Sequence, residues 1–157
     1  MNYSGQDALQ KAKNYCFLLL KYRLRSEKEL LFRLERKKFE KPVIEETLKF
    51  MKAKGFIDDS VFVREWISSR IKKPLGVHRL KQELRIKGIS APVIEQELER
   101  LKESYSEEDT VLQIATRQFQ KLKNLENTLA QKRVYGYLLR RGFSPEIIVN
   151  VINQLKL

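Results

Sequence analysis

The chain has 157 residues, of which 42% are hydrophobic, and only six glycines and four prolines interrupt it. This composition supplies a core and argues against wholesale disorder. The formal net charge of +12 is typical of a protein that binds a polyanion or an acidic protein surface.

The first predicted unit spans residues 7–56 and contains three helices, after a frayed segment at residues 1–6. A first helix begins at Asp7, since apolar residues recur at helical spacing from there. Ser26 and Glu29 have the spacing of a capping box, which predicts that a second helix starts at Ser26. Pro42 fits the first turn of a third helix, and Gly55 ends it.

The second predicted unit spans residues 57–105. Asp58 and Asp59 favour the start of its first helix, in which Phe62, Trp66 and Ile67 are the predicted buried anchors. Its second helix is basic and lies between Gly76, an acceptable N-cap, and Gly88, the residue type that closes a helix in the left-handed conformation. An acidic third helix runs from about Val93 to Lys102.

The third predicted unit spans residues 106–157. Acidic residues at 107–109 favour the start of its first helix. A longer loop is expected around Asn124 and Asn127, followed by a helix from about Leu129 to Arg141. Ser144 as N-cap with Pro145 in the first turn predicts the last helix. No segment has the alternating pattern of a strand.

The three units repeat one pattern. A shift of 50 residues places Leu30 on Leu80 and Leu34 on Leu84, and a further shift of 54 places Leu80 on Val134. Each unit is too small to bury a full core, so neighbouring units must share an interface. We therefore predict an all-α fold of three tandem three-helix repeats in an elongated, curved array, and a monomer.

The sequence offers almost nothing for catalysis. His78 is the only histidine and has no acid close to it in the sequence, so it is expected at the surface. Asp58 and Asp59 are explained by helix capping, and Cys16 lies in an apolar helical stripe. Zinc ligands and a glycine-rich phosphate loop are both missing from the sequence. We predict no catalytic, cofactor-binding or metal-binding residues, and a protein that is not an enzyme.

Cysteine content and hydropathy indicate the compartment. A single cysteine excludes an internal disulfide and fits a reducing environment. No apolar run approaches the roughly 18 residues of a membrane span, and the N-terminus lacks the order of a signal peptide. We expect a cytoplasmic protein that does not bind a membrane.

Positive charge follows the repeats. Residues 21–41 hold nine Lys or Arg against four Glu (net +5), residues 64–88 hold eight against two (+6), and residues 117–141 hold seven against one (+6). A solvated helix surface also explains mixed charge, but an excess this periodic favours a binding surface. The predicted contacts with a partner or DNA are Arg33, Lys37, Lys72, Lys73, Arg79, Lys81, Arg85, Lys132, Arg133 and Arg140.

Three motifs resemble the RecX family. The first is Gly55-Phe56-Ile57-Asp58-Asp59 followed by Phe62, similar to the junction between that family's first two repeats. The second is Gly76-x-x-Arg79-Leu80-x-x-Glu83-Leu84-x-x-Lys87-Gly88-Ile89, similar to its central helix. The third is Ser26-x-x-Glu29-Leu30-x-x-x-Leu34, similar to the first-repeat counterpart. Lys38 departs from the pattern, because a glycine is common there.

The resemblance implies a regulator of RecA recombinase. Members of the family bind RecA filaments on DNA, lodge in the filament groove, and usually suppress ATP hydrolysis and strand exchange, in the control of DNA repair, recombination and the SOS response. The competing hypothesis is a protein that binds single- or double-stranded DNA directly, through units that act like a helix-turn-helix. An enzyme is the least favoured alternative.

Overall fold

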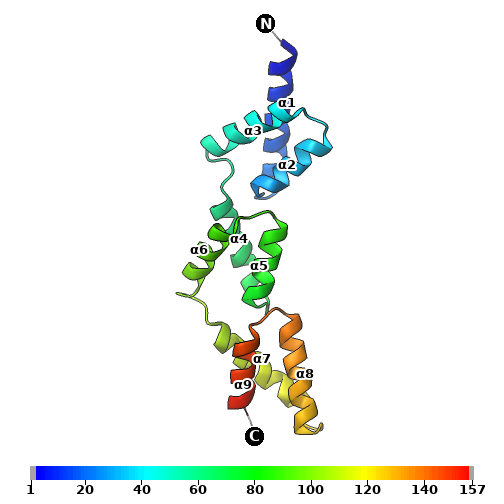
Figure 1. Ribbon diagram of the computed structural model, residues 1–157, viewed down its shortest axis with the longest axis vertical. Helices are drawn as coiled ribbons and strands as arrows, with labels where there is room; N and C mark the ends of the chain where they lie inside the picture. Colours follow the sequence, from blue (N-terminus) through cyan, green and yellow to red (C-terminus); the bar gives the residue numbers. More distant parts are fainter. Residues whose placement is uncertain (1–2, 156–157) are drawn as a thin grey trace. The chain divides into compact units, whose positions relative to one another are not determined.

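The computed structural model describes residues 3–155, which form nine α-helices and no strand (Figure 1). The helices are α1 (Tyr3–Tyr22), α2 (Glu27–Arg36), α3 (Lys41–Ala53), α4 (Asp59–Ile71), α5 (Val77–Ile86), α6 (Ala91–Leu101), α7 (Glu107–Lys121), α8 (Asn127–Arg140) and α9 (Pro145–Gln154). This element order confirms the all-α prediction of three helices per repeat. Part of the predicted frayed segment, residues 1–2, lies outside the described residues.

The chain divides into two compact units. Unit 1 contains the chain up to Glu65 together with Leu84–Ile94, and unit 2 contains Trp66–Glu83 together with the chain from Glu95. The helices of the second repeat contribute to both units, because each division falls inside α4, α5 or α6.

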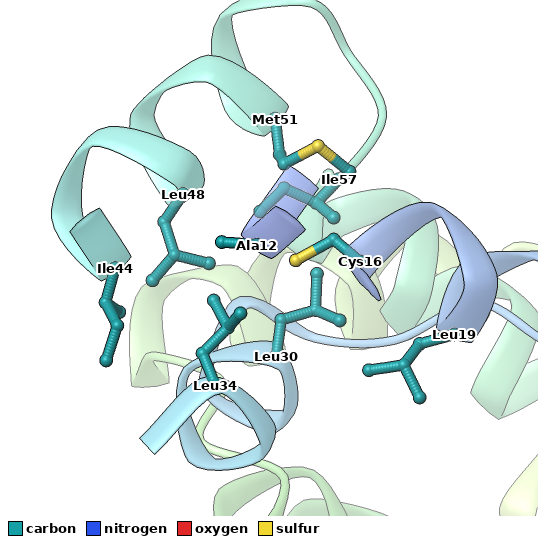
Figure 2. Packing of buried hydrophobic residues seen from close by; sticks show 9 residues of the cluster. All are labelled: Ala12, Cys16, Leu19, Leu30, Leu34, Ile44, Leu48, Met51 and Ile57. Carbon is teal, nitrogen blue, oxygen red and sulfur yellow. The ribbon is translucent and has the colours of Figure 1, made fainter. Parts of the chain in front are cut away.

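Unit 1 has a core of α1, α2 and α3 side chains (Figure 2). Leu30 and Leu34 are fully buried, as the spacing predicted, and Cys16 lies between them and α3. Burying a side chain of this size stabilises the fold by about 1.5–3 kcal/mol. Burial also raises the pKa of the Cys16 thiol to about 11, so the group is a packing residue and not a nucleophile at neutral pH.

Unit 2 has an equivalent core of α7, α8 and α9. Val134 and Leu138 occupy the positions that Leu30 and Leu34 hold in the first repeat, and both are buried. Phe143, in the turn after α8, is the largest fully buried side chain of the chain's described part. The repeat predicted from the sequence therefore has matching buried positions in both units.

Local signals set most helix ends. The Ser26 hydroxyl accepts the N–H of Glu29 while the Glu29 carboxylate accepts the N–H of Ser26, which confirms the capping box. Pro42 and Pro145 lie in the first turns of α3 and α9. Ser144 is the N-cap of α9, as predicted, although its side chain makes no capping hydrogen bond.

Three helices begin earlier than predicted. α6 starts at Ala91 and not at about Val93, with Pro92 in its first turn. α1 starts at Tyr3 and not at Asp7, and α8 starts at Asn127 and not at Leu129. The extra residues of α1 and α8 are mainly polar, so apolar periodicity did not mark them. The exposed His78 and the helix-capping role of Asp58, which accepts the N–H groups of Ser60 and Val61, are confirmed.

Most of the Trp66 side chain is covered, as predicted, but Trp66 is less completely buried than Phe62 and Ile67. Its Nε1–H donates to Glu83 Oε2 over 3.0 Å, and the Arg70 guanidinium lies 4.7 Å from the ring centroid. An indole N–H requires an acceptor, and the Glu83 carboxylate, which is 16% exposed and also pairs with Arg70 and Arg79, supplies it. Phe62 and Ile67 are buried as predicted.

Consecutive repeats are joined by hydrogen bonds to helix N-termini. In unit 1, the Glu27 N–H of α2 donates to Asp59 Oδ1 over 3.0 Å, and the Ser26 hydroxyl donates to the Lys87 carbonyl. These bonds satisfy polar groups that a helix end leaves without partners. The second helix of the first repeat is thus capped by the second repeat.

The same junction recurs inside unit 2. The Val77 N–H of α5 donates to Glu107 Oε1 over 3.0 Å, and the Gly76 N–H donates to the Arg141 carbonyl over 2.9 Å. Gly142 follows in the left-handed conformation, with φ +82°, and a Cβ there would overlap the backbone and Cβ of Arg79. The junction therefore requires glycine at this turn.

Candidate polyanion-binding surface

The ten predicted contact residues fall in both units. Arg33, Lys37 and Arg85 belong to unit 1, whereas Lys72, Lys73, Arg79, Lys81, Lys132, Arg133 and Arg140 belong to unit 2. Because the ten residues are divided between two units that are described separately, a single face through all ten residues stays a prediction.

Two adjoining hollows of unit 2 gather five of the predicted residues. The first lies between the loop after α4 and helices α7 and α8, and contains Lys72 and Lys73. The second lies between α7 and α8 and contains Lys132, Arg133 and Arg140. Gln118 and Tyr137 line both hollows. The two hollows together are called the basic groove below.

Two further cations of the basic groove were missed in the sequence analysis. Arg117 and Lys121 project from α7 into the first hollow. They are four residues apart, so they share one face of the helix. That spacing, inside a block already recognised as basic, was the signal that could have identified them.

The charge of the basic groove is not neutralised locally. Among the described residues that line it, none is Asp or Glu. Its seven cations, Lys72, Lys73, Arg117, Lys121, Lys132, Arg133 and Arg140, form no ion pair with any residue from 3 to 155. Like charges gathered in a concave surface produce a positive potential that attracts phosphate or carboxylate groups.

An aromatic ring separates the two hollows. The Arg141 guanidinium lies 4.8 Å from the centroid of the Tyr137 ring, and its NH1 donates to the Pro74 carbonyl over 3.4 Å. Stacking of this kind holds a guanidinium in one orientation. Arg141 thereby ties the loop after α4 to α8 and fixes the shape of the basic groove.

The other predicted residues of unit 2 are engaged in ion pairs. Arg79 Nε lies 3.3 Å from Glu83 Oε1, and Lys81 Nζ lies 2.8 Å from Glu95 Oε1. A partner that used either cation would first have to displace its carboxylate. These two side chains consequently offer less free charge than the basic groove does.

The predicted residues of unit 1 do not form one site. The Lys37 ammonium lies 5.3 Å from the centroid of the Tyr15 ring, and Arg85 is exposed on the last turn of α5. Arg33 is half-buried, and its Nε has no hydrogen-bond partner among the described residues. Neither the hollow between α2 and α3 nor the one at the start of α4 contains any of the three side chains.

Neither a metal-binding cluster nor a membrane-spanning helix is present among residues 3–155. Residues 3–155 contain no group of three or more His, Cys, Asp or Glu side chains placed to hold a metal ion. Within these residues, every helix is too short or too polar to cross a bilayer.

These features define a basic helical-repeat protein built from tandem three-helix domains. Models of the first, second and third three-helix domains of RecX match residues 12–51, 58–98 and 106–152. The matches follow the repeat order and cover most of the sequence, so the chain belongs to the RecX family of regulatory proteins.

Individual relatives agree with this assignment. The chain is 34% identical to the regulatory protein RecX of Chlorobium phaeobacteroides over 147 residues, which is 93% of this chain and 94% of that protein. It is 27% identical to the regulatory protein RecX of Streptomyces coelicolor, covering 95% of this chain and 79% of that protein. The crystal structure of RecX from Lactobacillus salivarius has the same fold, with a TM-score of 0.87, 22% identity, and coverage of 96% of this chain and 97% of that one.

Proposed function

We propose that this protein regulates RecA recombinase by binding RecA filaments on DNA and suppressing their ATP hydrolysis and strand exchange. It would act in the cytoplasm, in the control of DNA repair and recombination. The observation that carries the proposal is the match of all three RecX domains, in order, to residues 12–152.

The basic groove supplies a physical means of attachment. A RecA–DNA filament presents phosphates and protein surface over a long distance, and seven unneutralised cations complement a polyanion. A single surface Lys or Arg contributes little to affinity, but a complementary patch adds up and speeds the encounter. No catalytic step is needed, since occupying the filament is enough to hinder its cycle.

Filament binding can be separated from general charge effects by two double variants. Lys72→Glu with Lys73→Glu reverses the charge at one end of the basic groove, where both side chains are exposed. Lys21→Glu with Lys54→Glu makes the same charge change at exposed positions of unit 1. We expect the first variant to weaken co-sedimentation with RecA filaments about tenfold and the control less than about threefold. An equal loss of co-sedimentation in the two variants would show that the basic groove is not the contact with RecA filaments.

Direct DNA binding is a second candidate, favoured by the lack of carboxylates among the described residues of the basic groove. A helix-turn-helix mode fits poorly, because α6 carries three Glu and one Arg and α9 carries no Lys or Arg. The groove would instead follow a phosphate backbone, so affinity should fall with salt at a log–log slope of several units. Naked DNA bound as tightly as RecA filaments would favour this candidate over RecA regulation.

A further inference from the structure

A second groove lies on unit 1, between α2 and α3, and is distinct in chemistry from the basic groove. It encloses about 960 Å³. Its floor is apolar and is formed by Leu31, Phe39, Ile44, Leu48 and Ala53. The inner faces of Ile44 and Leu48 belong to the core of the unit (Figure 2), so the floor is held rigidly.

The two walls of this α2–α3 groove carry opposite charge. The α2 wall presents Glu27 and Glu35, which are eight residues apart and so flank Leu31 on one helix face. The α3 wall presents Lys41, Lys49 and Lys52 against one glutamate, Glu45. Lys52 reaches across to Glu27 with a separation of 3.0 Å and closes one end.

The equivalent groove of the second repeat, which lies in unit 2 between α5 and α6, is built differently. Lys81 stands where the first repeat has Leu31, and its ammonium crosses to Glu95 over 2.8 Å. Glu99 replaces Lys49, so the α6 wall is acidic. This groove fills its middle with an internal ion pair, whereas the α2–α3 groove leaves an apolar floor in the same place.

We infer that the α2–α3 groove is a docking site for an amphipathic helix of a partner protein, with an apolar stripe flanked by one basic and one acidic edge. The basic edge would face Glu35, and Glu27 once Lys52 is displaced from it; the acidic edge would face Lys49, and Lys41 once it parts from Glu45. Because the two walls carry opposite charge, the partner helix can dock in only one direction. Turning the helix end for end would exchange its edges and place like charges against each other.

The groove also limits the length of the docked helix. Glu27 and Glu35 are eight residues apart, which corresponds to about 12 Å along α2. Two to three turns of a partner helix, about 8–11 residues, would cover that distance. This inference goes beyond RecA regulation, since the site is defined by its own walls and floor.

Synthetic helices of about 14 residues test the inference. All four peptides share a leucine stripe and differ only in the residues that flank it. The mixed-edge peptide carries Lys along one edge and Glu along the other. The three control peptides carry Lys on both edges, Glu on both edges, or Gln on both edges. In titrations of the ¹⁵N-labelled full chain, the mixed-edge peptide should bind about tenfold tighter than the other three and shift α2 and α3 resonances first. Equal affinities, or shifts centred on other helices, would overturn the proposal.

Two variants give the test a matched control. Leu31→Lys introduces the residue that the second repeat has at this position, and should lower the affinity for the mixed-edge peptide at least about tenfold. The control, Ile86→Lys at a highly exposed position of α5, should leave that affinity unchanged. Should Leu31→Lys prove unfolded by circular dichroism, the exposed Lys49→Glu is decisive. It should weaken the mixed-edge peptide and spare the Gln-edged one. Parent-like binding by a folded variant would contradict the inference.

Discussion

The Asp59 carboxylate, at the start of α4, accepts the backbone N–H of Glu27, at the start of α2, over 3.0 Å. Burial raises the pKa of Asp59, and the hydrogen bond from Glu27 opposes that rise. Inside unit 2, the Glu107 carboxylate accepts the backbone N–H of Val77 at the start of α5, also over 3.0 Å. Each of these caps comes from the following repeat, so a repeat depends on its neighbour for backbone hydrogen bonding as well as for packing.

Removal of this cap should destabilise the protein. Asp59→Ala is expected to lower the free energy of unfolding by about 1–2 kcal/mol, since a helix N-terminus loses its acceptor. Asp7→Ala, which removes only an exposed ion pair with Lys11, should cost less than about 0.5 kcal/mol. Urea denaturation followed by circular dichroism measures both. Similar values for the two variants would mean that the Asp59 bond is not a structural cap.

Two glycine variants separate backbone strain from crowding at the junction. Gly55 and Gly142 are both left-handed, with φ +71° and +82°, but a Cβ meets nothing at Gly55 and overlaps Arg79 at Gly142. Gly55→Ala should cost about 1 kcal/mol from strain alone. Gly142→Ala should cost at least about 2 kcal/mol more. If thermal unfolding shows the same loss of stability for both variants, crowding against Arg79 adds no cost at Gly142.

Acid should weaken the cluster around Glu29. Burial raises the pKa of this carboxyl, but hydrogen bonds and charges from Arg23 and Lys87 outweigh burial and lower the pKa to about 2, from an ordinary value of 4.5. A depressed carboxyl pKa stabilises the fold above the unfolded-state pKa, and this stability is lost as the pH falls from about 4.5 towards 2. The free energy of unfolding of the parent should therefore be about 1–3 kcal/mol higher than that of Glu29→Gln at pH 6. This difference in stability should shrink at pH 3. A difference independent of pH would contradict the assignment.

Trp66 provides a spectroscopic test, because it is the only tryptophan. As a half-buried ring with a bonded N–H, it should emit at a wavelength between those of buried and fully exposed indoles. Trp66→Ala should cost about 1–3 kcal/mol, below the usual 3–5 kcal/mol for a fully buried ring. Glu83→Leu removes the acceptor of the indole N–H and should shift the emission without unfolding the chain. An unchanged spectrum in that variant would show that Glu83 does not bond the indole.

Features that depend on neighbours in sequence were predictable. The capping box of Ser26 and Glu29, the first-turn prolines and the leucine stripes all follow from spacing within one helix. The repeat itself followed from the recurrence of Leu30 and Leu34 at Leu80 and Leu84. These signals set the fold class because local preference and burial agree at each position.

Features that depend on contacts between different helices were not predictable. Asp59 looked like a cap for its own helix, whereas it caps α2, and only the folded chain brings Glu27 to it. Trp66 lay on an apolar pattern, but the carboxylate that holds it comes from α5. The basic groove needed α7 and α8 to lie together before Arg117 and Lys121 could be joined to Arg133.

The most direct test of the central claim is the DNA-dependent ATPase activity of RecA, measured with increasing amounts of the folded protein. We expect a progressive fall in ATP hydrolysis, a weaker effect for the Lys72→Glu, Lys73→Glu double variant, and a parent-like effect for the Lys21→Glu, Lys54→Glu control. An ATPase rate that stays unchanged at a molar excess of folded parent protein over RecA would contradict the proposed regulation.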